Sequence, residues 1–244
     1  MELTDGKITM KEIQDDRGYN QVWKDSEATR IRASRRCDKL LGQMDRDKDA
    51  SVLEIGCGLG SNAFQMATRS RFRVLATDLS PKFIEDARQR YQNSRLEFRV
   101  LDFNDTQMCA GMSFDYIVGN GILHHLYHDL DRALVNIRRL LKKGGKMVFY
   151  EPNLHNPYIF MIFSFAPLRR WAYLEPAEMA FSKGFAIEKL TRAGFRNIQV
   201  EHSDFLLPGI PRSLINPSIK MGAILERCPG LRNLAQSIFI CGTA

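Results

Sequence analysis

The chain has 244 residues, of which 44% are hydrophobic and 26% charged, with a formal net charge of +7 and a pI near 9.2. A chain of this length and hydrophobic content can bury one sizeable core, which excludes an intrinsically disordered protein. No apolar run approaches the roughly 18 to 20 residues that a membrane-spanning helix needs, and charged residues recur through residues 1–16, unlike a secretory leader. We therefore expect a cytoplasmic protein.

The cysteines and the positive charge narrow the choice of partners. The five cysteines form no C-x-x-C pair and have no histidine at metal-ligand spacing, which predicts free thiols and no zinc site. A positive charge leaves an anionic partner open, whether nucleic acid, a phosphorylated metabolite or a membrane surface. Paired basic residues such as Arg35 and Arg36 are predicted to lie on solvated faces of helices.

Residues 51–151 alternate between short β-branched runs and helical stretches, which is typical of βαβ units and a parallel sheet. Strands are predicted at Ser51–Ile55, Phe72–Thr77, Leu96–Leu101, Phe114–Val118 and Lys146–Tyr150. Helices are predicted at Ser61–Arg69, Pro81–Tyr91 and Asp129–Leu141, with Ser80 as an N-cap and residues 142–145 as a helix stop. A further helix at Lys183–Ala193 and strands at Arg196–His202 and Ser237–Gly242 complete the pattern.

Three segments lie outside this pattern within what we treat as a single domain, 1–244, with a cofactor-binding core at 50–151. Residues 8–44 are predicted to form a helical N-terminal cap, with Tyr19 and Trp23 on one helical face. Two insertions rich in proline and apolar residues, 152–182 and 204–236, follow the fifth and sixth strands. Both should roof the ligand-binding edge of the sheet as a substrate lid, although their aromatic residues could instead form only a satellite core.

A glycine loop connects the first strand to the helix that Ser61 opens, and it reads Glu54-Ile55-Gly56-Cys57-Gly58-Leu59-Gly60. Glycines allow the backbone to approach a ligand closely. A dinucleotide-binding G-x-G-x-x-G/A pattern would need glycine or alanine at position 61, where a serine stands. The acidic Glu54, two residues before the first glycine, suits a sulfonium amino acid better than a pyrophosphate.

Over residues 50–152 this pattern resembles the class I methyltransferase family, whose first-strand motif E-x-G-x-G-x-G binds S-adenosylmethionine. The resemblance implies an α/β fold with a Rossmann-like, doubly wound sheet of seven mostly parallel strands, the last one antiparallel. It implies that S-adenosylmethionine is the cofactor and S-adenosylhomocysteine the product. The residues it assigns to the cofactor are Glu54, Gly56, Cys57, Gly58, Gly60, Asp78, Leu79, Asp102, Phe103 and Asn120.

Individual roles follow from the same resemblance. Glu54 supports the loop or the amino group of the cofactor, Asp78 binds the ribose hydroxyls, and Asp102 with Phe103 contacts the adenine. Each acidic residue alone could instead be a helix N-cap. Three of them at the carboxyl ends of successive strands, in the order of the family, favour the cofactor.

Methyl transfer is an in-line displacement, so the enzyme must hold the nucleophile about 3 Å from the methyl group in a dry site. A hydroxyl acceptor must also lose a proton, and a neutral histidine with a pKa near its usual 6.5 is a suitable base. His124 and His125, which follow the fourth strand, are the candidates, although either could merely order its loop. Glu151, at the end of the fifth strand, could orient the acceptor or share a proton with a histidine.

The predicted function is methyl transfer to a small or medium-sized acceptor, at a hydroxyl oxygen of a sugar, polysaccharide precursor or secondary metabolite. No N-P-P-[YF] segment or Pro-Cys nucleophile follows the fourth strand, which disfavours nucleic acid as the acceptor. The sequence also lacks a compact cluster of aspartates, so we expect no bound metal. Arg169, Arg170 and Arg212 would suit an anionic acceptor, and the apolar stretch Tyr158–Phe165 could meet a membrane and a lipid-linked one. The alternatives are an RNA or protein methyltransferase, a non-catalytic cofactor-binding module and an NAD-dependent oxidoreductase.

Overall fold

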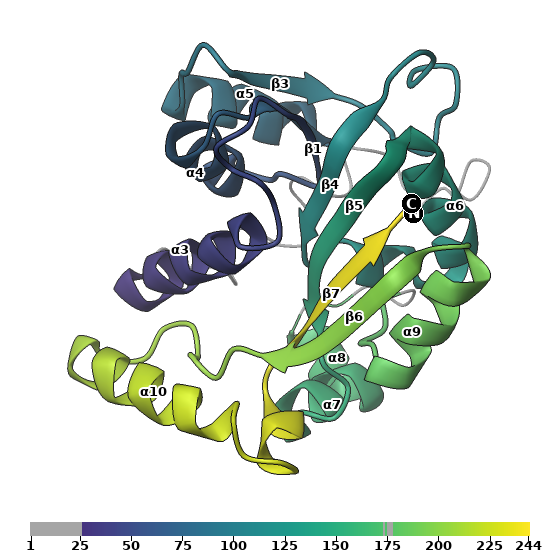
Figure 1. Ribbon diagram of the computed structural model, residues 1–244. Helices are drawn as coiled ribbons and strands as arrows, with labels where there is room; N and C mark the ends of the chain where they lie inside the picture. Colours follow the sequence, from purple (N-terminus) through teal and green to yellow (C-terminus); the bar gives the residue numbers. More distant parts are fainter. Residues whose placement is uncertain (1–25, 173, 175–177) are drawn as a thin grey trace.

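A computed structural model describes residues 26–172, 174 and 178–244 of the chain, and a central seven-stranded sheet runs through it (Figure 1). The strand order is β3-β2-β1-β4-β5-β7-β6, with β7 antiparallel to β5 and β6 and the other pairs parallel. The strands are β1 Ser51–Ile55, β2 Arg73–Asp78, β3 Leu96–Val100, β4 Phe114–Asn120, β5 Leu141–Pro152, β6 Arg196–Ser203 and β7 Ser237–Thr243. The predicted α/β fold, with its antiparallel last strand, is confirmed.

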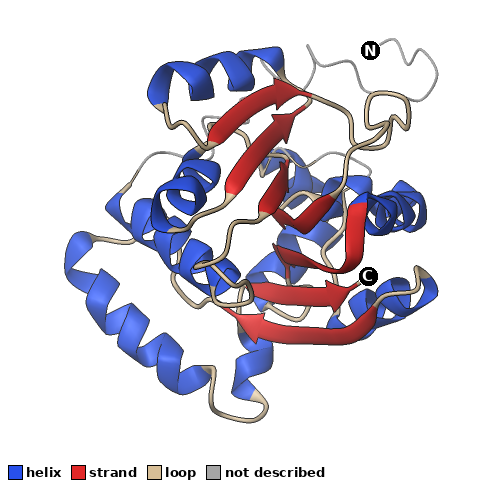
Figure 2. Ribbon diagram, turned by 45° about the horizontal axis from the view of Figure 1, so that its top comes forward, coloured by secondary structure: helices blue, strands red, loops and turns tan. Residues whose placement is uncertain are grey.

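Helices cover both faces of the sheet (Figure 2). They are α3 Glu27–Leu41, α4 Ser61–Arg69, α5 Pro81–Arg90, α6 Leu130–Leu140, α7 Pro157–Ser164, α8 Ala166–Trp171, α9 Lys183–Arg192 and α10 Arg212–Leu225, with short 3-10 helices η1 Leu123–Asp129 and η2 Leu231–Leu234. Because both faces are covered, the central strands β1 and β7 are buried along nearly their whole length rather than at alternate residues.

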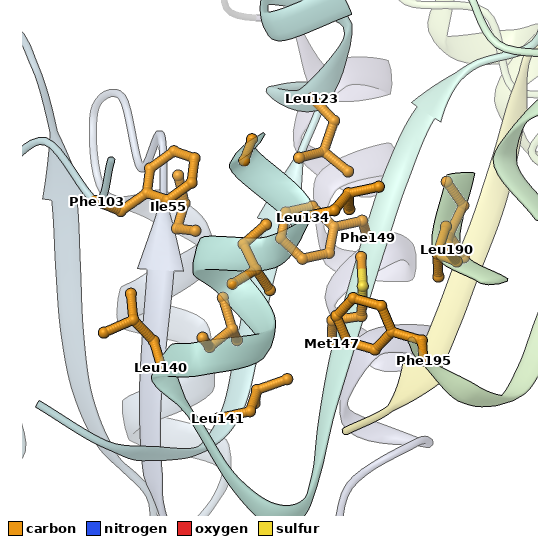
Figure 3. Packing of buried hydrophobic residues seen from close by; sticks show 14 of the residues in the cluster. Ile55, Phe103, Leu123, Leu134, Leu140, Leu141, Met147, Phe149, Leu190 and Phe195 are labelled. Carbon is orange, nitrogen blue, oxygen red and sulfur yellow. The ribbon is translucent and has the colours of Figure 1, made fainter. Parts of the chain in front are cut away.

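Two hydrophobic cores lie on opposite faces of the sheet. In one of them, Leu134 of α6 and Leu190 of α9 pack against Met147 and Phe149 of β5 (Figure 3). In the other, residues of α3, α4 and α5 such as Leu40 pack against β1 and β2. The sheet is therefore held rigidly between two helical layers, and its carboxyl edge can present side chains in fixed positions.

The predicted helices and strands of the central pattern are present, and their ends agree to within two residues except at the start of β5. Ser80 caps α5, because its hydroxyl accepts from the backbone N–H of Phe83 at 3.2 Å. Helix α6, however, ends at Leu140, and residues 142–145 belong to β5 rather than to a helix stop. Leu141 is extended because it pairs with Phe114 of β4, and Lys142 reaches Asp115 with its ammonium group at 2.7 Å. Pairing with β4 therefore extends β5 towards the N-terminus.

Both insertions meet at the carboxyl edge of the sheet. Asn153, at the start of the first insertion, donates from its side-chain amide to the carbonyls of Asn233 and Ala235 in the second, at 2.8 and 2.7 Å. The second insertion also packs on α3, where Ile215 contacts a small cluster with Ala28. Helix α3 agrees with the predicted N-terminal cap, whereas Tyr19 and Trp23 lie outside the described residues. That the insertions form a substrate lid stays a prediction.

Within the described ranges, no helix combines the length and the apolar character that crossing a bilayer would require.

Candidate active site

The glycine loop after β1 takes a backbone path that only glycine adopts readily. Gly56, Gly58 and Gly60 have φ angles of +67°, +49° and +80°. A Cβ added at Gly56 would lie 2.7 Å from Ile122, and one at Gly60 would lie 2.6 Å from the ring of Phe98. At Gly58, by contrast, no atom lies within 4 Å of the added Cβ. Two of the glycines therefore serve packing, whereas the third faces open space that a ligand can occupy.

Glu54 and Asp78 flank this open space with two acidic groups. Glu54 is 2% exposed, and its Oε1 accepts from the amide of Asn62 at 2.7 Å, whereas Oε2 is buried without a hydrogen-bond partner among the described residues. Burial raises the pKa of Glu54 to about 7. Asp78 accepts from the backbone N–H groups of Gly58 and Ser80, both at 2.9 Å, and its pKa is raised by burial as well. A buried carboxylate oxygen without a partner suits a cationic ligand group.

The other residues predicted to bind the cofactor occupy different environments. Cys57 is buried, and burial raises the pKa of its thiol, so it is an inert part of the loop. Asp102 is half-buried and accepts from the N–H of Asn104 at 2.8 Å. Phe103 is only 6% exposed and belongs mainly to the core, whereas the side chain of Leu79 is 37% exposed. Their contacts with adenine and ribose stay predictions.

The structure brings His124 and Glu151 together from separate elements. The Nδ1 of His124, on η1, lies 2.8 Å from Oε2 of Glu151, near the end of β5, and the Glu151 side chain is fully buried. The same carboxylate accepts from the backbone N–H groups of Ile122, Leu123 and His124, at 3.1, 2.8 and 3.2 Å. Glu151 therefore fixes both the loop and the orientation of the imidazole.

His125 forms a second pair of the same kind beside the first. Its Nδ1 lies 2.8 Å from Oε1 of Glu178, a residue of the first insertion that is 2% exposed. The two imidazole rings lie 4.1 Å apart, and Phe163 of α7 meets the His124 ring edge-on at 6.2 Å. Burial lowers the pKa of His124, and the neighbouring His125 lowers it further, so His124 is neutral at neutral pH.

The two histidine pairs adjoin the cofactor-side residues. Burial raises the pKa of Asp78, and the backbone N–H groups that it accepts from, together with the nearby His125, oppose this effect. A Cβ added at Gly121, which follows β4, would touch the His124 ring at 3.5 Å. The glycine loop, the acidic residues and the histidines therefore line one edge of the sheet.

Three charged residues of this region, Arg36, Glu178 and Asp204, were not predicted from the sequence to belong to it. For Arg36 the prediction of a solvated position was wrong. Arg36 is not on a solvated face, because its side chain is only 12% exposed and binds Asp204 at 2.7 Å. It also donates to Oδ1 of Asn120 at 2.8 Å, next to the predicted cofactor site. The spacing of Arg32, Arg36 and the apolar Leu40 along one helix face could have indicated this burial. Glu178 and Asp204 carry no such signal, because they lie in irregular insertions.

The basic residues predicted to suit an anionic acceptor are not alike. The guanidinium of Arg169 donates to the backbone carbonyls of Phe163 and Glu178, at 2.7 and 3.0 Å, and so links two parts of the first insertion. Arg212 pairs with Glu27 at 3.2 Å, and its side chain is 86% exposed. Arg170 is exposed. Of the three, Arg169 is therefore a structural residue rather than a ligand for an anion.

One group of side chains bears on the expectation that no metal is bound. In the described part of the chain, one donor atom from each of His124, His125 and Glu178 lies within 4.8 Å of the others. Two imidazoles and a carboxylate are common metal ligands. The absence of a metal therefore stays a prediction, which an assay with and without a chelator would check.

The strand order, the glycine loop after β1 and the acidic residues that follow it define a Rossmann-like α/β domain that binds a nucleoside cofactor at the carboxyl edge of its sheet. Residues 53–149 match the family described as the methyltransferase domain. These residues form a methyltransferase domain of the class I, S-adenosylmethionine-dependent kind.

Solved structures of this kind have the same fold. The S-adenosylmethionine-dependent methyltransferase from Archaeoglobus fulgidus is similar with a TM-score of 0.64 and 15% identity, covering 93% of this chain and 98% of that one. The CurJ carbon methyltransferase is similar with a TM-score of 0.63 and 19% identity, covering 98% of this chain and 62% of that one. At these identities the likeness concerns the fold alone.

A closer likeness in sequence is to part of a much larger protein. The highly reducing polyketide synthase NEC1 of Pyricularia oryzae is 26% identical over 212 residues, which cover 78% of this chain. The chain spans only 7% of the length of that relative.

Proposed function

We propose that the protein transfers a methyl group from S-adenosylmethionine to a small-molecule acceptor whose carbon or oxygen atom is deprotonated by His124. The observation that carries this proposal is the buried His124–Glu151 pair at the carboxyl edge of β4 and β5, beside the glycine loop. Such a pair can accept a proton as well as order its loop, because the carboxylate anchors one ring nitrogen and the other nitrogen can take part in chemistry.

The residues around the glycine loop fit the proposed cofactor. The unpartnered Oε2 of Glu54 can accept from the ammonium group, and the space beside Gly58 admits a ligand without a steric clash. The carboxylate of Asp78 has lone pairs in addition to those used by two backbone N–H groups. When bound, the cofactor supplies a methyl group on a cationic sulfur for in-line displacement.

His124 acts as the base in this proposal. The carboxylate of Glu151 accepts from the ring N–H at Nδ1, which leaves Nε2 to take the acceptor's proton. Once His124 is protonated, Glu151 stabilises the imidazolium. The site is shielded by Phe163 and the first insertion, which favours a dry environment for the displacement.

Two chemistries of the acceptor remain to be distinguished by experiment. The sequence pattern favours a hydroxyl oxygen, whereas the likeness to a polyketide synthase and to the CurJ carbon methyltransferase favours an acidic carbon of a secondary metabolite. A His124 base serves either, because both a hydroxyl group and the carbon between two carbonyl groups carry a proton to be removed. We therefore propose to assay a β-ketoacyl thioester and a hydroxylated aromatic compound, and to locate the labelled methyl group by NMR.

The decisive variants are His124→Ala and His125→Ala, which alter neighbouring imidazoles of the same loop. We expect His124→Ala to lower turnover by about 10² or more and to leave the affinity for S-adenosylhomocysteine nearly unchanged. His125→Ala should lower turnover less. Equal, small losses in both variants would exclude His124 as the base, and S-adenosylhomocysteine binding without turnover on any acceptor would favour a non-catalytic module.

The dependence of turnover on pH gives a second readout of the same assignment. Because burial lowers the pKa of His124, its neutral form persists to a pH below its usual value of 6.5. Turnover should therefore stay constant as the pH falls to 6.5 and should decrease only below the lowered pKa of His124. The residual activity of His124→Ala should not show this decrease. A fall that begins well above pH 7 would point to another base.

A further inference from the structure

The exposed apolar side chains of the protein are concentrated in the two insertions. Of fifteen large hydrophobic residues that are exposed in the described part of the chain, eleven lie in residues 152–182 and 204–236. Several of them are about half exposed or more, and Trp171 reaches 68%. The eleven are Tyr158, Phe160, Met161, Phe165, Trp171, Leu207, Leu214, Met221, Ile224, Leu231 and Leu234.

These residues belong to segments that are tied together in space. Helix α7 begins where η2 lies, because the side-chain amide of Asn156 donates to the carbonyl of Leu234 at 2.6 Å. Helices α7, α8 and α10 gather below the same end of the sheet (Figure 1). Helix α10 turns Ile215 and Gly222 inward, towards α3 and Phe205, so Leu214, Met221 and Ile224 lie outward.

The exposed charges among these apolar residues are mainly basic, although Arg212 pairs with Glu27 of α3 at 3.2 Å and the sequence of the first insertion also contains Glu175. Residues 205–244 contain a single acidic residue, Glu226, and its carboxylate accepts from the backbone N–H of Asp204 at 2.8 Å. Residues 153–172 contain no acidic residue. Exposed basic residues accompany the apolar ones on both insertions, and they are Arg170, Arg212, Lys220, Arg227 and Arg232.

We propose that these eleven apolar residues and five basic residues form a surface, here called the insertion surface, that docks on an anionic lipid bilayer. Apolar side chains that enter the interface and basic side chains that meet lipid phosphates are the two components of peripheral membrane binding. Trp171 and Tyr158 are of the residue types that favour the headgroup region. A partner with a neutral apolar surface would leave the excess positive charge of this surface without a counterpart.

Docking in this way would turn the carboxyl edge of the sheet, where the insertions meet, towards the bilayer. Binding to lipid requires neither cofactor nor acceptor, so the proposal does not depend on the methyl transfer proposed above.

Flotation of the full chain with phosphatidylcholine vesicles, with or without about one third phosphatidylglycerol, tests this proposal. We expect binding to the anionic vesicles, weak binding to the neutral ones, and a loss of binding in 0.5 M salt, because salt screens the basic residues. The double variant Trp171→Ser/Ile224→Ser should partition at least about tenfold less. The double variant Lys220→Glu/Arg227→Glu should partition roughly tenfold less or lower still, and only onto anionic vesicles.

Matched controls come from the rest of the surface. Val135→Ser removes an apolar side chain that is 54% exposed on α6, and Arg90→Glu reverses an exposed charge on α5, so both should bind vesicles like the wild type. Thermal unfolding of every variant checks that the fold is kept. Binding that is equal in the wild type and in both double variants would overturn the proposal. The absence of any binding to vesicles would also overturn the proposal. A concentration-dependent dimer that Trp171→Ser/Ile224→Ser abolishes would instead assign the surface to a second copy of the chain.

Discussion

At the scale of single residues, Glu54 combines two properties that are costly in a folded protein. Its carboxylate is buried, and one of its oxygens has no hydrogen-bond partner in the described part of the structure. Burial raises its pKa from 4.5 to about 7, so the ionised form destabilises the fold increasingly as the pH rises from 4.5 to 7. A cationic ligand group would relieve this cost, which agrees with the predicted role of Glu54 in binding the amino group of the cofactor.

Cofactor binding should therefore depend on pH. An ammonium group favours the ionised form of Glu54, so the affinity for S-adenosylhomocysteine should rise as the pH rises towards about 7 and level off above that value. Glu54→Gln should bind the cofactor more weakly, without that rise. Calorimetric titration checks both, and methylthioadenosine, which lacks the ammonium group, is the control ligand. Equal weakening for both ligands would indicate a general disturbance of the loop instead.

At the scale of elements, the turn from β1 into α4 depends on glycines for two different reasons. Gly60 has no room for a Cβ because Phe98 and Ala87 lie 2.6 and 3.0 Å from its position. Gly58 has that room, although its φ of +49° still disfavours a side chain. The loop is thus closely packed on its inner side and open on the side of the cofactor.

Alanine substitutions separate these two reasons. We expect Gly60→Ala to lower the free energy of unfolding by about 3 kcal/mol, because it adds a steric clash to the strain of a positive φ. Gly58→Ala should lower the free energy of unfolding by only about 1 kcal/mol. It should weaken S-adenosylhomocysteine binding more strongly than Gly60→Ala does, because its Cβ enters the open space. Urea unfolding and calorimetry of both variants give the comparison. Unchanged affinity in Gly58→Ala would place the cofactor elsewhere.

At the scale of the whole molecule, Asp204 joins the N-terminal helix to the second insertion. Its Oδ2 accepts from the Nε of Arg32 and of Arg36, at 2.6 and 2.7 Å, and all three side chains are nearly buried. Burial would raise the pKa of Asp204, but the two guanidinium groups outweigh it and hold the pKa below 3.8. The same Arg36 reaches Asn120 at the end of β4. Helix α3, the insertion and the predicted cofactor site are therefore coupled through one buried ionic cluster.

Asp204→Asn tests this coupling without altering the backbone, because asparagine also tolerates the φ of +78° at this position. Removing one charge leaves two buried guanidinium groups unbalanced, so we expect a loss of about 3 kcal/mol in the free energy of unfolding at pH 7. The carboxylate stabilises the fold above pH 3.8, so the difference from the wild type should shrink only as the pH falls below that value. Arg212→Gln, which breaks an exposed pair between the same two segments, should cost less than about 1 kcal/mol.

The sequence by itself determined the central pattern of this protein. The β-branched runs, the Ser80 cap and the glycine loop are local signals, because each depends on neighbouring residues along the chain. The resemblance to the family implied seven strands with the last one antiparallel, whereas the strand order β3-β2-β1-β4-β5-β7-β6 came from the structure. The end of α6 was misplaced because pairing of Leu141 with β4, a contact between distant residues, decides where β5 begins.

Only the tertiary structure decided which charged residues come together. Glu151 and His124 were both predicted candidates, but their 2.8 Å contact follows from the parallel pairing of β4 and β5. Glu178 and Asp204 lie in irregular segments, where no periodicity indicates which way a side chain points, and the partner of Arg36 lies in one of them. Burial and charge pairing depend on contacts between residues far apart in the chain, and these contacts exist only once the sheet and its two insertions have assembled.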